Sequence, residues 1–363
     1  MRLFQNSGIS TAYKKRLKSL ARGQTTFAGR LTVFLEDRYG ASHFLKPVLV
    51  GDKNAFFTNG DDVELQRAWA FENGLRSSAD PQSILLAQIE AHRTEVFYNL
   101  DPMRFGSDFV RRLPACVKAK ICWRAAPSPG ADFAAYDLVL CNFPSIIESW
   151  RSQGLRAEYF TPGHDWRMDD FIDQGERPID VVFVGSYTRH HMHRARLLEA
   201  VVGLADRHKI VFCLDRSRLT RLAETHLGIF PMLRAHRRPE SIRLNSMDPV
   251  FGIDLYKLLA SSKIVLNGAI DMAGEDRGNM RCFEALGSGA LMISDIGHYP
   301  QGFQSDYNML TYETPEDAVR LISTTLNGWV RAKEIASHGH AMIRDRYSKD
   351  AQWDAFQRLV AIS

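Results

Sequence analysis

Two arginines and a glutamate gather in one segment, Asn267 to Ser294, which reads NGAIDMAGEDRGNMRCFEALGSGALMIS. Arg277 and Arg281 can give charge-assisted hydrogen bonds to a diphosphate. Glu284 follows Arg281 at the spacing of one helical turn, and its carboxylate is an acceptor of the kind that holds ribose hydroxyls. The pattern indicates a site for a nucleoside diphosphate. The alternative is an ion pair between Arg281 and Glu284 on a solvated helix surface, which contributes only about a few tenths of a kcal/mol.

A short helix between two buried strands must position these residues. The runs SKIVLNG and GALMISD are apolar and rich in β-branched residues, so the segment between them is one right-handed βαβ crossover. The helix is expected to begin after Gly278, with Asn279 as its N-cap, and to end at Gly287 to Gly289. Its N-terminus then lies at the carboxyl edge of the sheet, where free N–H groups and the helix dipole favour a phosphate.

Strand-like runs alternate with amphipathic stretches along the whole chain, which is typical of a parallel α/β fold. The expected strands are RLTVFLED, PVLVGD, TEVFYNL, AKICWRA, YDLVLCN, AEYFTPG, IDVVFVGS, KIVFCLD, SKIVLNG, GALMISD and YNMLTY. A polar stretch with Pro and Gly, TPGHDWRMDDFIDQGERPID, separates the two strand sets. We therefore predict two Rossmann-like domains facing a cleft, residues 1–170 and 171–345, and a C-terminal helix, residues 346–363, that packs back on the first domain.

The segment GSYTRHHMHRARL follows the first strand of the predicted second domain. Gly185 and Ser186 let the backbone approach a ligand, and Arg189 or Arg194 could reach its phosphates. A metal site is the competing interpretation of His190, His191 and His193. Ligands so close together at a helix start do not share a face, and no cysteine or carboxylate has metal spacing to them, so no metal site is predicted.

The composition is that of an ordinary globular protein, with 45% hydrophobic residues, 24% charged residues and a net charge of +4. The small charge and the lack of a basic stripe interleaved with aromatics argue against a nucleic-acid partner. Five scattered cysteines inside mostly apolar runs indicate reduced thiols in a cytoplasmic protein. No window has the character of a signal peptide or a membrane span. The basic run from Lys14 to Arg22 is interpreted as a solvated helix face, with contact to the inner face of an anionic membrane as the alternative.

The order and spacing of FVGS, SKIVLNG and RCFEALGSGALMISD, with VFGIDLYKLLASS upstream and MIRDRYSKDAQWDAF downstream, resemble the C-terminal domain of group 1 glycosyltransferases. The nearest likeness is to the branch that includes the spore-maturation CgeB-like proteins. The resemblance covers about residues 178 to 355 and implies the GT-B fold, with an acceptor-binding first domain and a nucleotide-sugar-binding second domain. It also implies a hexosyltransferase of polysaccharide biosynthesis. The enzyme is expected to be metal-independent, since the chain lacks the Asp-x-Asp triplet by which the other large glycosyltransferase fold holds a divalent cation.

The resemblance assigns roles to single residues. Glu284 stands where the family glutamate before Ala-x-x-x-Gly holds the ribose. The earlier acid of the family's Glu-x7-Glu pattern, which approaches the donor sugar, is here Asp276, next to Glu275. This departure leaves open which acid meets the sugar, and whether the retaining mechanism of those enzymes applies. Asp276 is predicted to be catalytic. The predicted donor-binding residues are Gly185, Ser186, Arg189, Asn267, Arg277, Asn279, Arg281 and Glu284.

Candidate catalytic bases lie at predicted strand ends of the first domain. Asp101 ends the run TEVFYNL and would deprotonate an acceptor hydroxyl. The competing interpretation is that Asp101-Pro102 merely forms a turn. The loop WRAAPSPGADF, with Arg124 and Asp132, is a second candidate for the acceptor site, whereas His164-Asp165 is expected to be structural.

We therefore expect a glycosyltransferase that moves a sugar from a nucleotide diphosphate to a hydroxyl of a glycan, lipid or small molecule. No cofactor and no metal are expected. One alternative is a nucleotide-sugar epimerase on the same fold, which would need acid and base groups around the sugar and no acceptor. The other is a non-catalytic protein that binds a sugar nucleotide or a glycan.

Overall fold

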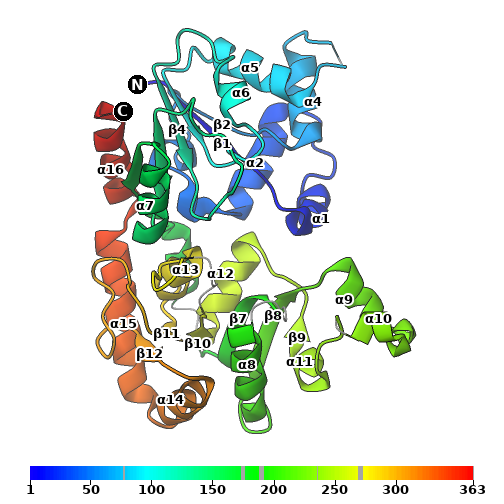
Figure 1. The fold of residues 1–363 in the computed structure, drawn as a ribbon, viewed down its shortest axis with the longest axis vertical. Helices are drawn as coiled ribbons and strands as arrows, with labels where there is room; N and C mark the ends of the chain where they lie inside the picture. Colours follow the sequence, from blue (N-terminus) through cyan, green and yellow to red (C-terminus); the bar gives the residue numbers. More distant parts are fainter. Residues whose placement is uncertain (77, 173–175, 188–191, 235, 269–272, 363) are drawn as a thin grey trace. The chain divides into compact units, whose positions relative to one another are not determined.

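The computed structural model describes residues 1–76, 78–172, 176–187, 192–234, 236–268 and 273–362 (Figure 1). The chain divides into two compact units. The first unit comprises Met1–Gly163 together with Lys349–Ser363, and the second comprises His164–Ser348. The chain thus crosses between the units after Gly163 and again after Ser348, where the sequence predicts boundaries at residues 170 and 345.

The first unit contains one six-stranded parallel sheet in the order β2-β1-β3-β4-β5-β6. Its strands are β1 (Leu3–Ser7), β2 (Ala55–Asn59), β3 (Val96–Asn99), β4 (Ala119–Trp123), β5 (Leu138–Cys141) and β6 (Ala157–Tyr159). Its helices are α1 (Thr11–Leu20), α2 (Phe27–Asp37), η1 (Ala41–His43), α3 (Lys46–Leu49), α4 (Val63–Glu72), α5 (Pro81–Ala91), α6 (Ser107–Val110), α7 (Pro144–Ser152) and α16 (Lys349–Ala361). From β1 the chain first goes to β2 on one side and then to β3 on the other, so the strand order reverses between β1 and β3.

The second unit contains another six-stranded parallel sheet, in the order β12-β11-β10-β7-β8-β9. Its strands are β7 (Ile179–Ser186), β8 (Ile210–Asp215), β9 (Ser246–Met247), β10 (Ser262–Leu266), β11 (Leu291–Asp295) and β12 (Leu310–Tyr312). Its helices are η2 (Trp166–Phe171), α8 (Met192–Val201), η3 (Val202–Leu204), α9 (Arg218–Ala223), η4 (His226–Ile229), α10 (Pro231–Arg234), α11 (Glu240–Leu244), α12 (Gly252–Ala260), α13 (Met280–Gly287), α14 (Pro315–Asn327) and α15 (Trp329–Arg346). Here the strand order reverses between β7 and β10.

Helices cover both faces of the second sheet. Successive side chains of a strand point to opposite faces, and both sets of side chains are apolar here, so both faces must be covered. On one face Val181 and Phe183 belong to a buried cluster with residues of α8 and α14. On the other face Val182 and Val265 pack in a cluster with residues of α12 and α13. This double cover explains why the strands read as continuous apolar runs rather than as alternating ones.

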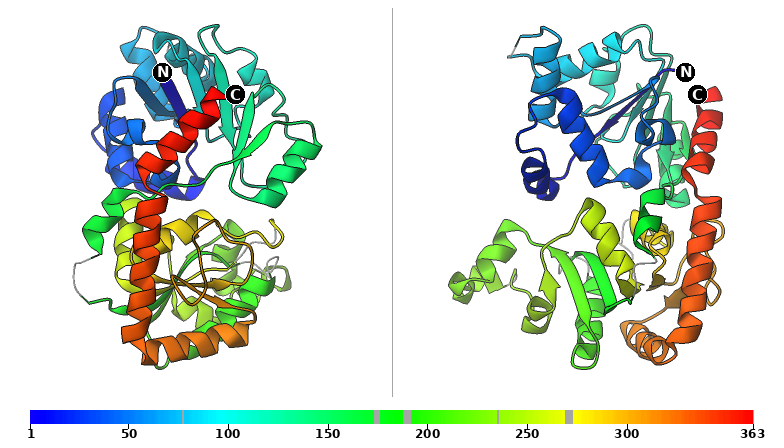
Figure 2. Two further views of the ribbon diagram at one scale, coloured as in Figure 1. Left: turned by 90° about the vertical axis from the view of Figure 1, so that its left-hand side faces the viewer. Right: turned by 180° about the vertical axis from the view of Figure 1, so that it is seen from behind.

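The C-terminal helix α16 belongs to the first unit, and Figure 2 shows it beside the strands of that unit. Phe356 is buried, and its ring packs against the rings of Tyr98 and Phe160. At the start of the helix, Lys349 is buried and its ammonium group donates hydrogen bonds to the carbonyls of Ala41, Ser42 and Phe44. The helix is therefore held by both an apolar anchor and a buried polar anchor.

Two of the predicted strands are wrong. The run RLTVFLED is helical and forms most of α2, with the hydroxyl of Thr26 accepting from the N–H of Gly29 as an N-cap. Its buried residues Phe27 and Phe34 are seven positions apart, which is a helical repeat. The run PVLVGD overlaps the short helix α3, which begins one residue earlier and has Pro47 in its first turn, a position that suits proline.

The sequence analysis missed β1, although β1 lies inside the first sheet. Its polar residues Gln5 and Asn6 hide it from a search for apolar runs. Both are fully buried, and Asn6 is satisfied because its amide donates to the Asn99 side chain while its oxygen accepts from the N–H of Gly60. A buried polar strand is stable under these conditions because its hydrogen bonds replace those to water.

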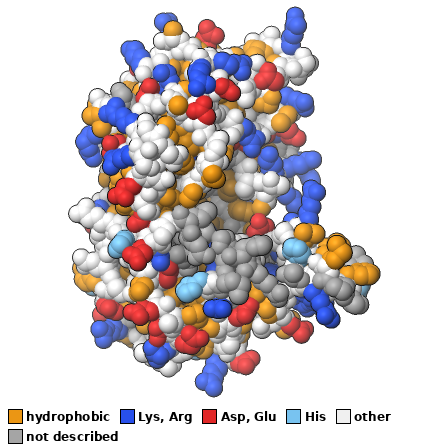
Figure 3. Space-filling model, viewed as in Figure 1, with side chains coloured by type: hydrophobic (Ala, Val, Ile, Leu, Met, Phe, Trp, Pro, Cys, Tyr) orange, Lys and Arg blue, Asp and Glu red, His pale blue; other side chains and the backbone are white. Residues whose placement is uncertain are grey.

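All five cysteines are free thiols; Cys116 is partly exposed and the other four are buried. In the part of the chain that the model describes, no helix combines the length and the apolar character needed to cross a bilayer. On the face in Figure 3, basic and acidic side chains are interspersed. Within the N-terminal basic run, Arg16 pairs with Asp37 at 2.6 Å and Lys14 lies 3.4 Å from Asp61, so part of this run is engaged inside the first unit.

Candidate functional site

The carboxyl ends of β7 and β10 meet at the point where the strand order of the second sheet reverses. In parallel α/β sheets, ligands bind outside the strand ends at such a point. Gly185 and Ser186 are the last residues of β7, where they pair with Leu214 and Asp215 of β8. Asn267 directly follows β10. Three predicted donor-site residues therefore lie at this reversal point, although Gly185 and Ser186 belong to the strand rather than to a turn after it.

Helix α13 begins beside these strand ends, and its bounds confirm the predicted helix and N-cap. The Asn279 side-chain oxygen accepts from the N–H of Cys282 at 3.3 Å, and its amide donates to the Asn267 oxygen at 3.2 Å. The Asn267 amide in turn donates to Ser294 Oγ at 3.0 Å. These bonds tie the ends of β10 and β11 to the first turn of α13. The free N–H groups of that turn are thereby held in place for an anion.

Arg281 and Glu284 form an ion pair in which Arg281 Nη1 lies 2.6 Å from Glu284 Oε2. The predicted alternative of an intrahelical pair is thus present, but it is not solvated, because the two side chains are only 15% and 4% exposed. Burial raises the pKa of Glu284, and the guanidinium of Arg281 opposes this shift. Among the described residues, no acceptor forms a hydrogen bond with the buried Nε of Arg281. The arginine therefore keeps a donor for a ligand.

Arg277 is engaged by Asp295 at the end of β11 and by a carbonyl of its own loop. Its Nε lies 2.7 Å from Asp295 Oδ2, and its Nη1 donates to the carbonyl of Gly274 at 2.8 Å. The loop itself is pinned by two backbone hydrogen bonds, from Arg277 to His298 and from His298 to Glu275. The guanidinium thus has fewer donors for a diphosphate than the sequence alone indicates.

The two adjacent acids of this loop differ in exposure. The side chain of Asp276 is 9% exposed, with an oxygen 3.9 Å from His298 Nδ1, whereas that of Glu275 is 83% exposed. Asp276 is therefore the acid that the loop encloses beside α13, and Glu275 faces solvent.

Arg194 of α8 reaches the loop after β10. Its Nη2 donates to the carbonyl of Gly268 at 2.8 Å, and its guanidinium lies over the Phe183 ring. It is buried, so its established contact is with the protein backbone. Arg189, His190 and His191 lie outside the described residues, and His193 is exposed.

In the first sheet, Asp101 lies just after β3, on the carboxyl side of the strand-order reversal. Gly8 lies just after β1, and a side chain there would come within 2.7 Å of Asp101 Oδ2. The carboxylate can lie in this position because residue 8 is a glycine. Burial raises the pKa of Asp101, and Arg104, whose Nε lies 3.1 Å away, opposes the shift. The backbone carbonyl of Asp101 also accepts from the N–H groups of Arg104 and Phe105. Asp101 therefore forms the turn of the competing interpretation and also has a largely buried carboxylate.

The sequence analysis missed Asp61, a second carboxylate in this place. Its side chain is fully buried and accepts from the N–H of Ile9 at 2.9 Å. Lys14 and Arg104 each bring a nitrogen within 3.4 Å of it. The run AFFTN before it is a good strand signal, and recognising that strand would have placed Asp61 at the same sheet edge as Asp101.

The other first-unit candidates have local partners. Arg124 Nε donates to Ser128 Oγ at 2.6 Å. Asp132 is exposed and accepts from the N–H of Ala134 and from Ser107 Oγ, which lowers its pKa. At the start of the second unit, Asp165 accepts from Arg167 and from the Tyr256 hydroxyl, which fits the structural role expected for it.

Comparisons with known proteins agree with this architecture. Residues 234–358 match the protein family described as glycosyl transferase-like. The Anabaena protein HepE, solved in complex with UDP-glucose, superposes with a TM-score of 0.59 at 12% identity over 99% of each chain. A glycosyltransferase from Rickettsia africae gives 0.58 at 10% identity over 99% of this chain and 97% of that one. The chain has the GT-B glycosyltransferase fold.

A more distant GT-B structure, TarM of S. aureus, gives a TM-score of 0.52 at 13% identity, over 77% of this chain and 59% of that one. A search of proteins with curated functions finds no significant match. The nearer likeness to CgeB-like proteins stays a prediction.

Proposed function

We propose that the protein is a hexosyltransferase that moves a sugar from a nucleoside diphosphate sugar to a hydroxyl of a glycan, lipid or small molecule. The observation that supports this most is the first turn of α13, whose cap is tied to two strand ends and whose Arg281–Glu284 pair is buried beside it. HepE has been solved with UDP and with UDP-glucose, so a UDP-sugar is the first donor to test.

In this proposal the N–H groups of α13 and the Arg281 side chain hold the departing diphosphate. The internal pair would open on binding, with Arg281 turning to the phosphates and Glu284 released to accept from the ribose hydroxyls. Electrostatic stabilisation by these groups takes the place of a metal in the transfer. Addition of Mg²⁺ or Mn²⁺ is therefore expected to leave the rate unchanged.

Asp276 is the acid we propose to lie nearest the donor sugar, because the loop encloses it while Glu275 faces solvent. Asp101 is the proposed general base that takes the proton of the acceptor hydroxyl. The five free thiols fit the reducing environment of the cytoplasm. A contact with an anionic membrane surface would use Lys15, Lys18 and Arg22, since Lys14 and Arg16 are engaged by Asp61 and Asp37.

The test is UDP affinity, measured by titration calorimetry on the full chain. Arg281→Ala is expected to weaken binding by about 10- to 100-fold, the loss of one charge-assisted contact to a phosphate. Arg320→Ala is the matched control, because Arg320 also forms an (i, i+3) ion pair, with Asp317, on the exposed surface of α14. Equal UDP affinity in the wild type and Arg281→Ala would refute the proposed donor site.

A further inference from the structure

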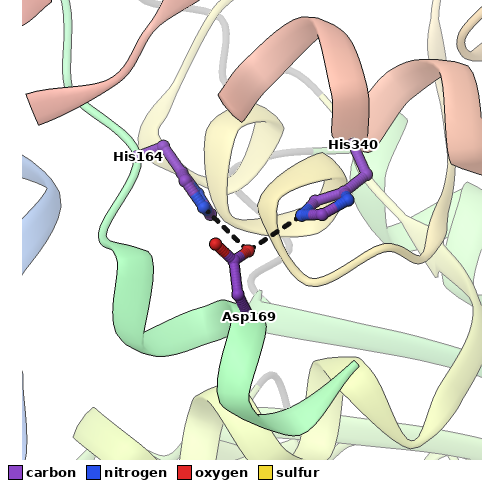
Figure 4. A group of neighbouring side chains, drawn as sticks. All are labelled: His164, Asp169 and His340. Atoms are coloured by element: carbon purple, nitrogen blue, oxygen red, sulfur yellow. Dashed lines mark hydrogen bonds and ion pairs between the residues drawn. The ribbon is translucent and has the colours of Figure 1, made fainter. Parts of the chain in front are cut away.

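Three side chains of the second unit converge on one point at the start of that unit. Figure 4 shows His164 and His340 aimed at the same carboxylate, that of Asp169. The Nε2 atoms of the two rings lie 3.0 and 2.9 Å from Asp169 Oδ1. These three atoms all lie within 4.8 Å of one another. We call His164, Asp169 and His340 the His–Asp–His cluster.

The cluster joins the start of the second unit to one of its last helices, because His164 and Asp169 are five residues apart and His340 lies 171 residues after Asp169. His164 opens the second unit, Asp169 lies in η2, and His340 lies in α15. The side chain of His164 is 3% exposed and that of His340 19%, whereas Asp169 is 36% exposed. The cluster is therefore enclosed on the side of the histidines and open to solvent on the side of the carboxylate.

The spacing of the three atoms suits a small divalent ion. Zinc binds imidazole nitrogen and carboxylate oxygen at about 2.0–2.2 Å, which places tetrahedral ligands roughly 3.3 Å apart. The two N···O separations are a few tenths of an ångström shorter than this, as expected for hydrogen bonds that occupy the place of the ion. The third separation, between the two Nε2 atoms, is within 4.8 Å, so side-chain movement must bring all three atoms to ligand distance from one ion.

We propose that the His–Asp–His cluster binds a divalent transition metal of the zinc class, through His164 Nε2, Asp169 Oδ1 and His340 Nε2. Two imidazoles and one carboxylate favour zinc over magnesium or calcium, which prefer oxygen ligands. The open side of Asp169 leaves a fourth position for water.

The proton balance of this step follows from the metal-free state. An ionised carboxylate only accepts, so each Nε2 carries a hydrogen that it donates to Asp169. To bind the metal, each ring must present the Nε2 lone pair, either by moving its hydrogen to Nδ1 or by releasing a proton if the ring is charged. Zinc binding is therefore expected to weaken as the pH falls.

The site lies away from the proposed donor site. A side chain on Gly287, the last residue of α13, would come within 2.8 Å of the His164 ring, so the cluster adjoins the C-terminal end of that helix. Asn279 caps the other end, and a helix of eight residues is about 12 Å long. The metal would therefore tie α15 to η2 rather than take part in sugar transfer, and the proposal does not depend on the proposed activity.

The test is the zinc content and zinc affinity of the tag-free full chain. Protein stripped with a chelator and dialysed against limiting Zn²⁺ should retain one zinc per chain and melt at a higher temperature than the stripped protein. Co²⁺ in place of Zn²⁺ should give the visible absorption of a four-coordinate site. His340→Ala and Asp169→Asn are each expected to weaken zinc binding by about 100-fold or more.

His338→Ala is the matched control, because His338 lies two residues earlier on α15 and is exposed. It should bind zinc as the wild type does. Asp169→Asn keeps the shape of the side chain, and circular dichroism of the stripped proteins checks that each variant is folded. Wild-type protein that retains no stoichiometric zinc would contradict the proposal. So would a folded Asp169→Asn variant that retains zinc fully. Either result would mean that the cluster only links its helices by hydrogen bonds.

Discussion

Arg281 and Glu284 are largely withdrawn from water, and this changes what their contact contributes. A buried ion pair gains little net stability, because the cost of removing two charges from water offsets their attraction. The pair also leaves the Nε of Arg281 without a hydrogen bond to the described residues. In the proposed donor site, a nucleotide would offer phosphate oxygens to Arg281 and ribose hydroxyls to Glu284. We infer that the ion pair holds both side chains in position in the ligand-free state and opens when a nucleotide binds.

Asp101 is the residue whose substitution separates catalysis from donor binding. If it is the general base, Asp101→Asn should lower kcat by about 10²- to 10⁴-fold while leaving UDP affinity unchanged. The pH dependence has a definite sign. Burial raises the pKa of Asp101 above that of an ordinary carboxyl, and Arg104 opposes the rise. The ionised base is lost as the pH falls through that raised pKa, so kcat should fall on the acidic side.

Asp132→Asn is the control for this prediction, because Asp132 is an exposed carboxylate in a neighbouring loop with a lowered pKa. Steady-state rates and UDP titrations of both variants, from acidic to neutral pH, provide the measurement. An Asp101→Asn variant with the kcat and pH profile of the wild type would exclude Asp101 as the base.

At the scale of the element, α13 is a short helix whose start is held by side chains from its neighbours. Asn279 caps it, and Asn267 links that cap to Ser294 at the end of β11. Asn267 itself is 4% exposed, so it has little surface for contact with a ligand. Its side chain orients the Asn279 cap instead. This framework limits the movement of the first-turn N–H groups, which is what anion binding requires.

Two substitutions of Asn279 test the charge preference of this helix end. Asn279→Ser and Asn279→Asp both keep a capping oxygen for Cys282 and both lose the amide contact to Asn267. They differ in one negative charge. If a diphosphate lies at the α13 N-terminus, Asn279→Asp should bind UDP about tenfold or more weakly than Asn279→Ser, because like charges repel at short range.

The measurement is a pair of UDP titrations at low and at high salt, together with thermal melts. The difference between the two variants should shrink at high salt, because salt screens the repulsion. Similar melting temperatures would show that both caps hold the helix. Equal UDP affinity in the two variants would place the diphosphate elsewhere.

The sequence predicts α13 and its cap well because all their determinants are local: Asn279 at the cap, glycines at the end, and apolar strands on either side. It does not predict that α2 is a helix, since Thr32 and Val33 resemble a strand and the decision depends on how Phe34 packs against Phe44 and Phe57. It also cannot foresee that Arg277 is held by Asp295, or that Asp61 lies close to Arg104. Those contacts depend on which strands become neighbours in the sheet, and residues far apart in the sequence decide that.

At the scale of the whole molecule, the chain belongs to the first unit at both of its ends. Lys349–Ser363 rejoins Met1–Gly163 after the second unit has been completed. Folding of the first unit therefore depends on a segment that follows the whole of the second unit in the sequence. The second unit is continuous, so it can complete its sheet without the C-terminal segment.

Lys349→Met should destabilise the first unit while leaving the proposed donor site intact. Lys349 is 2% exposed, and its ammonium donates to the carbonyls of Ala41, Ser42 and Phe44 at 2.8–2.9 Å. Methionine fills a similar volume but cannot donate. The Phe44 carbonyl then loses its hydrogen bond, whereas the carbonyls of Ala41 and Ser42 each keep one from a backbone N–H. With all the ammonium's hydrogen bonds lost, we expect a loss of about 3 kcal/mol in the free energy of unfolding. For a unit of this size that corresponds to a melting temperature lower by about 6–12 °C.

Lys46→Met is the control, because Lys46 pairs with Asp350 of helix α16 at the surface, where an ion pair contributes at most about 1 kcal/mol. Scanning calorimetry with and without UDP distinguishes the units: UDP should raise the transition of the second unit in every variant, whereas Lys349→Met should lower only that of the first. A single transition that shifts as a whole in both experiments would show that the two units unfold together and would contradict this prediction.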